Sequence, residues 1–379
     1  ITITETTIVR AASFPADALP SKTATWSYFL RENSTLPIVS LVTDPDNLTG
    51  PQGIYTNHEQ AWSEKWEREA TVAMYEDGGG FTIDCGIRMH GRTSRRVSEK
   101  KSFTLKFRGR YGGELGYDVF GDGIVTDFSS LLLRASVEDT YTSYMRDEFF
   151  ARIAMDYTDV PAQNYRYVSL FLNGEYWGIY CLKDDITRQY YANLTGTAKE
   201  DVTMLSSPVP QSAAVYTEAL GLWKDTSLTR EEAYECFCAA VDMDGFIDWV
   251  LLEGYCANVD IKSNLRYLRT GDGPWQIVFY DLDWAFQTRN NCFFNLIGPE
   301  QTAQIAPTIR WLFGIDDFRE RLLTRYAELT GTTLSDGHVT EKIDEFRALL
   351  APEMARERAR WGGTAGAWEE SVDALRANI

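Results

Sequence analysis

Two carboxylates lie one residue apart in the segment WQIVFYDLDWAF, at Asp281 and Asp283. The apolar stretch before them indicates a buried strand, and strand alternation puts both acids on the face of Ile277 and Phe279, about 6–7 Å apart. Like charges at the end of a buried strand repel each other, and a divalent cation with bridging phosphate oxygens resolves that conflict. Two alternatives stay open: acids that face solvent beyond the strand, and a glycosidase pair, although such pairs normally come from different strands.

The segment NVDIKSN is a second candidate, because Asp260 and Asn264 follow the end of an expected helix and therefore lie on a loop. A protein kinase catalytic loop supplies an Asp as base for the substrate hydroxyl and, shortly after it, an Asn as metal ligand. Lys262 adds to the similarity, although the spacing from Asp to Asn is one residue shorter here. The alternative is that Asn258 and Asp260 only terminate the helix.

A third segment is strongly basic in a chain whose net charge is −18. Residues 88–110 carry one acid against Arg88, Arg92, Arg95, Arg96, Lys100, Lys101, Lys106, Arg108 and Arg110. Strand alternation places Lys101 on the core face with Phe103 and Leu105, where a buried ammonium requires an anion or a carboxylate. Lys100 and Lys106 fall on the other face. The segment predicts a polyanion site; the alternative is a solvated basic strand whose Lys101 reaches water.

The elements that must position these segments are strands first and helices later, which predicts an α+β fold with two lobes. Strands are expected within 36–44, 70–91, 100–107, 129–136 and 165–185, the last with an Asn173-Gly174 hairpin turn. Helices are expected within 143–155, 230–241 and 244–258, the last capped by Asp244, and from about residue 308 onward. Residues 1–34 read as the final strands of a truncated β-sandwich-like domain or a linker, and 35–379 as the main domain.

Composition excludes several classes of protein. The 379 residues are 44% hydrophobic, which suits a packed core. The acidic balance disfavours nucleic acid and anionic membranes, and no apolar run approaches the roughly 18 residues of a membrane span. The six Cys residues lack zinc-type spacing, and most of them lie in apolar surroundings and are expected to be buried free thiols rather than disulfides. The chain does not begin with Met and shows no signal peptide, so we expect a fragment or a processed product.

Taken in order, these segments resemble the spore coat protein H (CotH) kinase family over residues 35–362. The resemblance rests on TDPDNLTGPQGIY, HGRTSRRVSEKKSFTLKF, YMRDEFFARIA, FLNGEYWGIYCLKDDI, NVDIKSN and YDLDWAFQ. It implies a two-lobed, highly diverged protein-kinase-like fold, with a mixed β-sheet in the N-terminal part and helices in the C-terminal part.

The resemblance also implies an activity and a set of site residues. The activity is transfer of the ATP γ-phosphoryl group, with Mg²⁺ or Mn²⁺, to Ser or Thr of a protein. Asp260 resembles the catalytic Asp, and Asn264, Asp281 and Asp283 the metal ligands. Contacts to the nucleotide phosphates fall on Lys101, Arg92, Arg95, Lys100 and Arg146, with Asp184 supporting. The family implies a secreted or cell-surface location, the spore coat included, and attachment to other domains of a larger protein.

The chain departs from the family pattern at several of these positions. His90 replaces an Arg before Gly91, Asp184 replaces a Glu, Leu265 takes the place of a second Asn, and Gln287 replaces a Gly. These departures keep open a catalytically inactive CotH-like binding or scaffold module on the cell surface. A carbohydrate-active hydrolase, with Trp and Tyr side chains along a glycan cleft, is the third reading.

Overall fold

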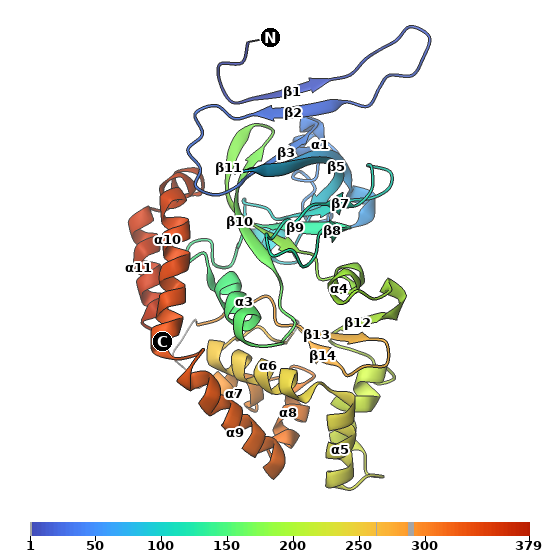
Figure 1. Ribbon diagram of the computed structural model, residues 1–379, viewed down its shortest axis with the longest axis vertical. Helices are drawn as coiled ribbons and strands as arrows, with labels where there is room; N and C mark the ends of the chain where they lie inside the picture. The colour runs from blue at the N-terminus through green and yellow to red at the C-terminus, as the bar shows by residue number, and fades with distance from the viewer. Residues whose placement is uncertain (1, 263, 287–291) are drawn as a thin grey trace. The chain divides into compact units, whose positions relative to one another are not determined.

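A computed structural model describes residues 2–262, 264–286 and 292–379 and confirms the predicted α+β class (Figure 1). The chain folds into two compact units that interleave in sequence. The first comprises Ile1–Thr140, Tyr165–Asp185 and Ala348–Trp368, and the second Tyr141–Asn164, Ile186–Arg347 and Glu369–Ile379.

The first unit is built on a closed β-barrel in the order β10–β11–β9–β6–β5–β4–β3 (Figure 1). Neighbouring strands are antiparallel except β10 and β3, whose parallel pairing closes the barrel. The strands are β3 (Ile38–Thr43), β4 (Arg68–Glu76), β5 (Gly79–Met89), β6 (Phe103–Lys106), β9 (Ser130–Arg134), β10 (Tyr165–Leu172) and β11 (Glu175–Asp184).

Register explains how the barrel fills its interior. Leu105 pairs with Ile87 on one side and Leu131 on the other, and Phe103 is flanked in the same way by Met89. These side chains are buried, as expected for the core face of β6. On the opposite face of the sheet, Arg88 pairs with Thr104, and Lys106 with Ser130. Period-two alternation thus separates an apolar face from a polar one.

The β10–β11 hairpin turns at Asn173 and Gly174, as predicted. Both residues have positive φ, +51° and +88°, which a two-residue type I′ turn requires. The first unit also contains β1 (Thr7–Ala11), β2 (Ala24–Tyr28), α1 (Pro45–Thr49), α2 (Ser94–Val97), β7 (Leu115–Gly116) and β8 (Asp127–Phe128). The strands predicted in residues 1–34 form the antiparallel β1–β2 pair.

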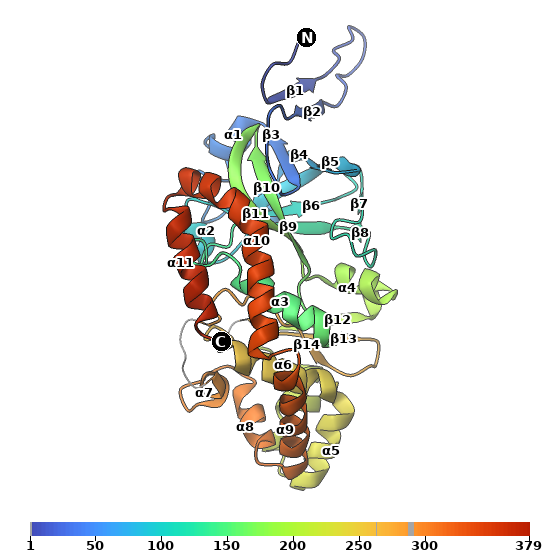
Figure 2. The same ribbon diagram turned by 60° about the vertical axis from the view of Figure 1, so that its left-hand side comes forward.

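The second unit is mainly helical, with a small three-stranded sheet in the order β12–β13–β14. Helix α6 packs against α7 and α9 (Figure 2). The helices and strands of the second unit are α3 (Arg146–Tyr157), α4 (Arg188–Thr195), β12 (Val202–Ser206), α5 (Arg230–Ala240), α6 (Met243–Cys256), β13 (Arg266–Thr270), β14 (Gln276–Ile277), α7 (Cys292–Ile297), α8 (Ala306–Leu312) and α9 (Asp316–Gly331). Helices α10 (Asp336–Trp361) and α11 (Ala365–Arg376) contribute residues to both units.

Three further expectations can be compared with the structure. None of the helices in the described part of the chain is long and apolar enough to cross a bilayer. Cys85, Cys181 and Cys256 are buried as expected, whereas Cys236 is exposed and Cys238 is half-buried; the side chain of Cys292 lies outside those described. The cap of α6 is Asp242 and not the predicted Asp244, because the Asp242 side chain accepts the N–H of Gly245.

Candidate functional site

The NVDIKSN segment begins directly after α6. The helix ends at Cys256, and Ala257 adopts a left-handed conformation with φ +50°. Asn258 then turns the chain, since its Oδ1 accepts the N–H of Asp260 at 3.0 Å. Asp260 therefore lies on a loop between α6 and β13, as the sequence predicts.

The Asp260 carboxylate lies close to two other predicted site residues. Asn264 Nδ2 donates a hydrogen bond to Asp260 Oδ2 at 3.2 Å. Burial raises the pKa of Asp260, the negative charge of Asp281 raises it further, and the bond from Asn264 offsets part of this rise. The effect of Asp281 shows that two carboxylates from distant stretches of the second unit share one environment. A raised pKa also makes a carboxylate a stronger proton acceptor.

The segment around Asp281 and Asp283 is not a strand, so their predicted common strand face is wrong. Strand β14 ends at Ile277, and Phe279 makes only an isolated bridge with Ala162. Asp281 has φ +63°, a left-handed conformation that breaks the alternation before the second acid is reached. Asp283 is buried at the turn that follows.

A residue that sequence reasoning missed holds this turn in place. The N–H of Leu282 donates to Asp147 Oδ1 at 3.0 Å, and Asp147 is buried in the first turn of α3. Asp147 thus fixes the backbone between the two acids. The available signal was an acid in the first turn of a helix rich in apolar residues, directly after Arg146. Arg146 is itself buried, with Nη1 donating to Thr142 Oγ1 at 2.7 Å.

Asp260, Asn264 and Asp281 carry oxygen atoms of the kind that bind divalent cations. Among the residues that the structure describes, no three His, Cys, Asp or Glu side chains form a group that could hold a metal by themselves. Mg²⁺, however, is usually held by only one or two carboxylates plus substrate phosphates and water. Asn264 uses its amide nitrogen on Asp260, so this bond does not consume its carbonyl oxygen, the atom that a cation requires. The repulsion between Asp260 and Asp281 is what a cation would relieve.

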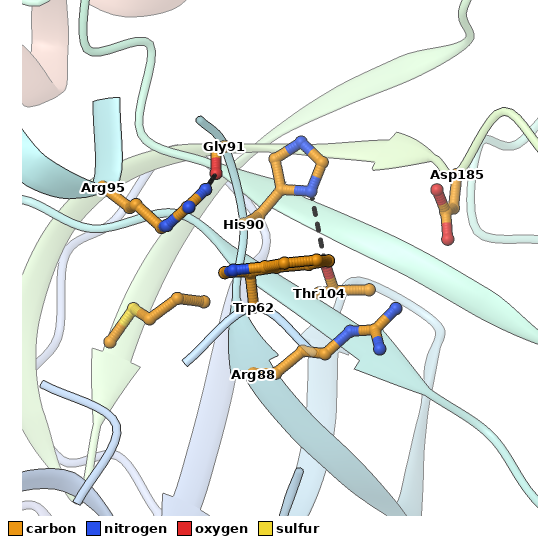
Figure 3. Close-up of a pocket in the computed structure, with 8 residues that line it drawn as sticks. Trp62, Arg88, His90, Gly91, Arg95, Thr104 and Asp185 are labelled. Atoms are coloured by element: carbon orange, nitrogen blue, oxygen red, sulfur yellow. Dashed lines mark hydrogen bonds between the residues drawn. The ribbon is translucent and has the colours of Figure 1, made fainter. Parts of the chain in front are cut away.

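The first unit contains a cavity of about 300 Å³ beside the ends of β5, β6 and β11. It is lined by Trp62, Arg88, Met89, His90, Gly91, Arg95, Thr104 and Asp185. Figure 3 shows the Trp62 indole between the side chains of His90 and Arg88. Arg88 and Thr104 come from the polar face of the sheet, so the strand alternation that fills the barrel core also builds this wall.

Cationic groups dominate this cavity. The Arg95 guanidinium donates to the carbonyls of Gly91 and Glu59 and lies 5.8 Å from the centre of the Trp62 ring. Asp185 accepts bonds from Lys106 Nζ at 2.7 Å and Ser130 Oγ at 2.8 Å. Burial opposes ionisation of Asp185, but Lys106 and Ser130 outweigh it and lower the pKa of this carboxyl.

The charge of Asp185 is therefore already balanced by Lys106, and the guanidinium groups of Arg88 and Arg95 give the cavity an excess of positive charge. Guanidinium groups bind the oxygens of carboxylate and phosphate anions. Of the lining residues, sequence reasoning selected only Arg95. Arg88 and His90 belong to the basic segment, whereas Trp62 and Asp185 come from other parts of the chain.

The two predicted lysines differ in their partners. Lys100 Nζ donates to Glu357 Oε1 and to the Ile179 carbonyl, both at 2.6 Å, and burial lowers the pKa of Lys100. This buried ion pair gives Lys100 a structural role in place of the expected phosphate contact. Lys101 Nζ donates to the Arg95 carbonyl at 2.7 Å and so supports the turn that carries Arg95. Because β6 begins only at Phe103, its alternation does not extend back to either lysine.

Arg92 is exposed on the turn before α2, and Asp184 is buried at the end of β11. Gln287, the departure after WAF, lies outside the described residues.

Comparison with protein families gives a match over most of the chain. The family model described as CotH kinase protein matches residues 87–217 and 210–379. No curated protein matches the chain. The family match covers the basic segment, NVDIKSN and YDLDWAF, and also the segments that carry Arg146 and Asp184.

Proposed function

Because the chain belongs to the CotH kinase family, we propose that it is an atypical protein kinase that transfers the γ-phosphoryl group of ATP to a Ser or Thr hydroxyl. The family assignment indicates a kinase-like transferase. The observation that carries the proposal is the shared environment of Asp260, Asn264 and Asp281, in which a base, an amide and a second carboxylate lie together.

In the proposed reaction, the oxygen of the substrate hydroxyl bonds to the γ-phosphorus while Asp260 accepts the proton of that hydroxyl. The bond from that phosphorus to the bridging oxygen breaks, and ADP leaves. Asn264 orients the Asp260 carboxylate through the bond to Oδ2. A divalent cation held by Asn264, Asp281 and Asp283 would neutralise the phosphate charge. Asp147 keeps the backbone between these two acids in position.

We also propose that Arg95 and Arg88 make the cavity of the first unit an anion-binding site. Lys101 supports Arg95 through its main-chain carbonyl. From the family resemblance we also propose that the substrate is an extracellular or coat protein, and that the protein acts outside the cell.

The decisive experiment replaces Asp281 with Asn, because Asn tolerates the left-handed conformation at this position while removing the charge. We expect phosphoryl transfer from Mg²⁺-ATP or Mn²⁺-ATP to casein to fall by about 100-fold or more, with an unchanged circular dichroism spectrum. Asp272→Asn, at an exposed acid between β13 and β14, is the matched control.

Equal ATP consumption by the wild-type protein and Asp281→Asn would overturn the assignment. Calorimetric binding of Mn²⁺-ATP without any turnover would instead identify a non-catalytic nucleotide-binding module.

A further inference from the structure

Glu253 is a buried acid that the proposed reaction does not use. It lies in the apolar sequence VLLEGYC of α6 and is 4% exposed. Its neighbours one turn away along the helix, Trp249, Val250, Cys256 and Ala257, are all buried as well. Within the described part of the chain, Glu253 Oε2 has no hydrogen-bond partner, and no Lys or Arg forms an ion pair with it.

Asn258 is a second buried residue with an unsatisfied side-chain atom, in this case a donor. Its side chain is 2% exposed, and its Oδ1 holds the backbone N–H of Asp260. Its Nδ2 is buried and has no partner among the described residues. One end of this amide therefore positions Asp260, while the other end is a buried donor that lacks an acceptor.

The donor and the acceptor lie close to each other. Burial raises the pKa of Glu253 to about 8, and the nearby Asn258 side chain offsets part of that rise. Glu253 is therefore mainly a neutral carboxylic acid at pH 7. A neutral carboxyl group can accept from Asn258 Nδ2 directly or through one buried water, and either arrangement removes the cost of two unsatisfied polar atoms.

We propose that Glu253 is a positioning residue whose buried carboxyl group orients the Asn258 amide, which in turn holds the backbone of Asp260. This role rests on the proposed function, in which Asp260 accepts the substrate proton. Glu253 touches neither substrate nor nucleotide in this scheme. Glu253 acts on the geometry of the Asp260 loop only through Asn258.

The test compares Glu253→Ala, Glu253→Gln and the control Leu252→Ala, which opens a cavity on the same buried helix without removing a polar group. Glu253→Gln keeps a neutral group of the same shape. We expect Glu253→Ala to lower kcat with casein by about 10- to 100-fold, since small displacements of a catalytic group have effects of this size. The KM for ATP should stay within about twofold of the wild-type value, and Glu253→Gln should restore kcat.

Hydrogen exchange provides a readout that does not require activity. Amides of residues 257–262 should exchange faster in Glu253→Ala than in the wild-type protein, Glu253→Gln or Leu252→Ala. Should Glu253→Ala fail to fold, Asn258→Ala takes its place, with the same expected loss of kcat and of protection.

The outcomes separate this inference from the proposed function. If Glu253→Ala matches Leu252→Ala in both kcat and exchange, the positioning role is overturned. If the wild-type protein transfers no phosphoryl group but the exchange difference is present, the proposed function fails and the support of the loop by Glu253 stands.

Discussion

Two buried glutamates on helices, Glu357 in the first unit and Glu253 in the second, have opposite surroundings. Glu357 is fully buried, with Oε1 bonded to Lys100 Nζ at 2.6 Å and Oε2 accepting the Ile179 N–H at 2.7 Å. Glu253 is nearly as buried, yet among the described residues no cation pairs with it. One carboxylate is charged and satisfied on both oxygens, whereas the other is kept neutral by burial.

The difference shows how position relates to role. Glu357 of α10 and its partner Lys100 both bond to the backbone of Ile179, so the pair joins α10 to strand β11. Glu253 instead lies one turn before the loop that carries Asp260. Complete satisfaction of buried charge is typical of structural ion pairs, and an incompletely satisfied polar group is more common where function constrains the sequence.

The largest predicted change in unfolding free energy comes from removing the cationic partner of Glu357. Lys100→Met leaves Glu357 as a buried acid without the ammonium group of Lys100, a situation similar to that of Glu253. Breaking a buried ion pair from one side costs about 3–5 kcal/mol of unfolding free energy. Urea denaturation at pH 7 measures this loss.

The double variant Lys100→Met/Glu357→Leu is the control, because replacing both charges by apolar groups of similar size is often close to neutral. A loss for Lys100→Met below about 1 kcal/mol, the range of exposed pairs, would contradict a buried structural pair.

The second prediction concerns how Glu253 links stability to pH. Its pKa is raised from 4.5 to about 8 in the folded protein. Between these values the unfolded state releases the proton first, so the wild-type unfolding free energy falls as pH rises through this window and levels off above it. Glu253→Gln lacks this dependence.

The stability advantage of Glu253→Gln over the wild-type protein should therefore grow from near zero at pH 4.5 to a few kcal/mol at pH 8, as each pKa unit is worth about 1.4 kcal/mol. Urea denaturation at pH 5 and pH 8 measures it. An advantage that is the same at both pH values would mean that Glu253 is already ionised in the folded state.

The two regions also differ in how far the sequence could predict them. The loop position of Asp260 follows from a local signal, the end of an apolar helix, and the core face of β6 follows from alternation. The left-handed Asp281 and the bond from Leu282 to Asp147 depend on tertiary packing across more than a hundred residues, which no local pattern encodes.

The roles of buried charges were equally inaccessible. Lys100 and Lys101 are adjacent and of one type, and only the fold shows that Lys100 pairs with Glu357 while Lys101 supports Arg95. Helical periodicity likewise buries Glu253 but cannot reveal whether a cation accompanies it.

The smallest predicted effect distinguishes stability of the helix from geometry of its loop. Asp242 caps α6 by accepting the Gly245 N–H, and its Oδ2 also accepts from Gln276 Nε2 at 2.9 Å. Asp242→Ala should cost about 1 kcal/mol of unfolding free energy, as for other N-caps. Asp244→Ala, which removes only an exposed pair with Arg321, should cost at most about 0.5 kcal/mol. Because the cap lies at the far end of α6 from Asn258, neither variant should change kcat. A fall in kcat for Asp242→Ala equal to that of Glu253→Ala would show that loosening the helix anywhere is enough to displace Asp260, and Glu253 would then have no special part in positioning the loop.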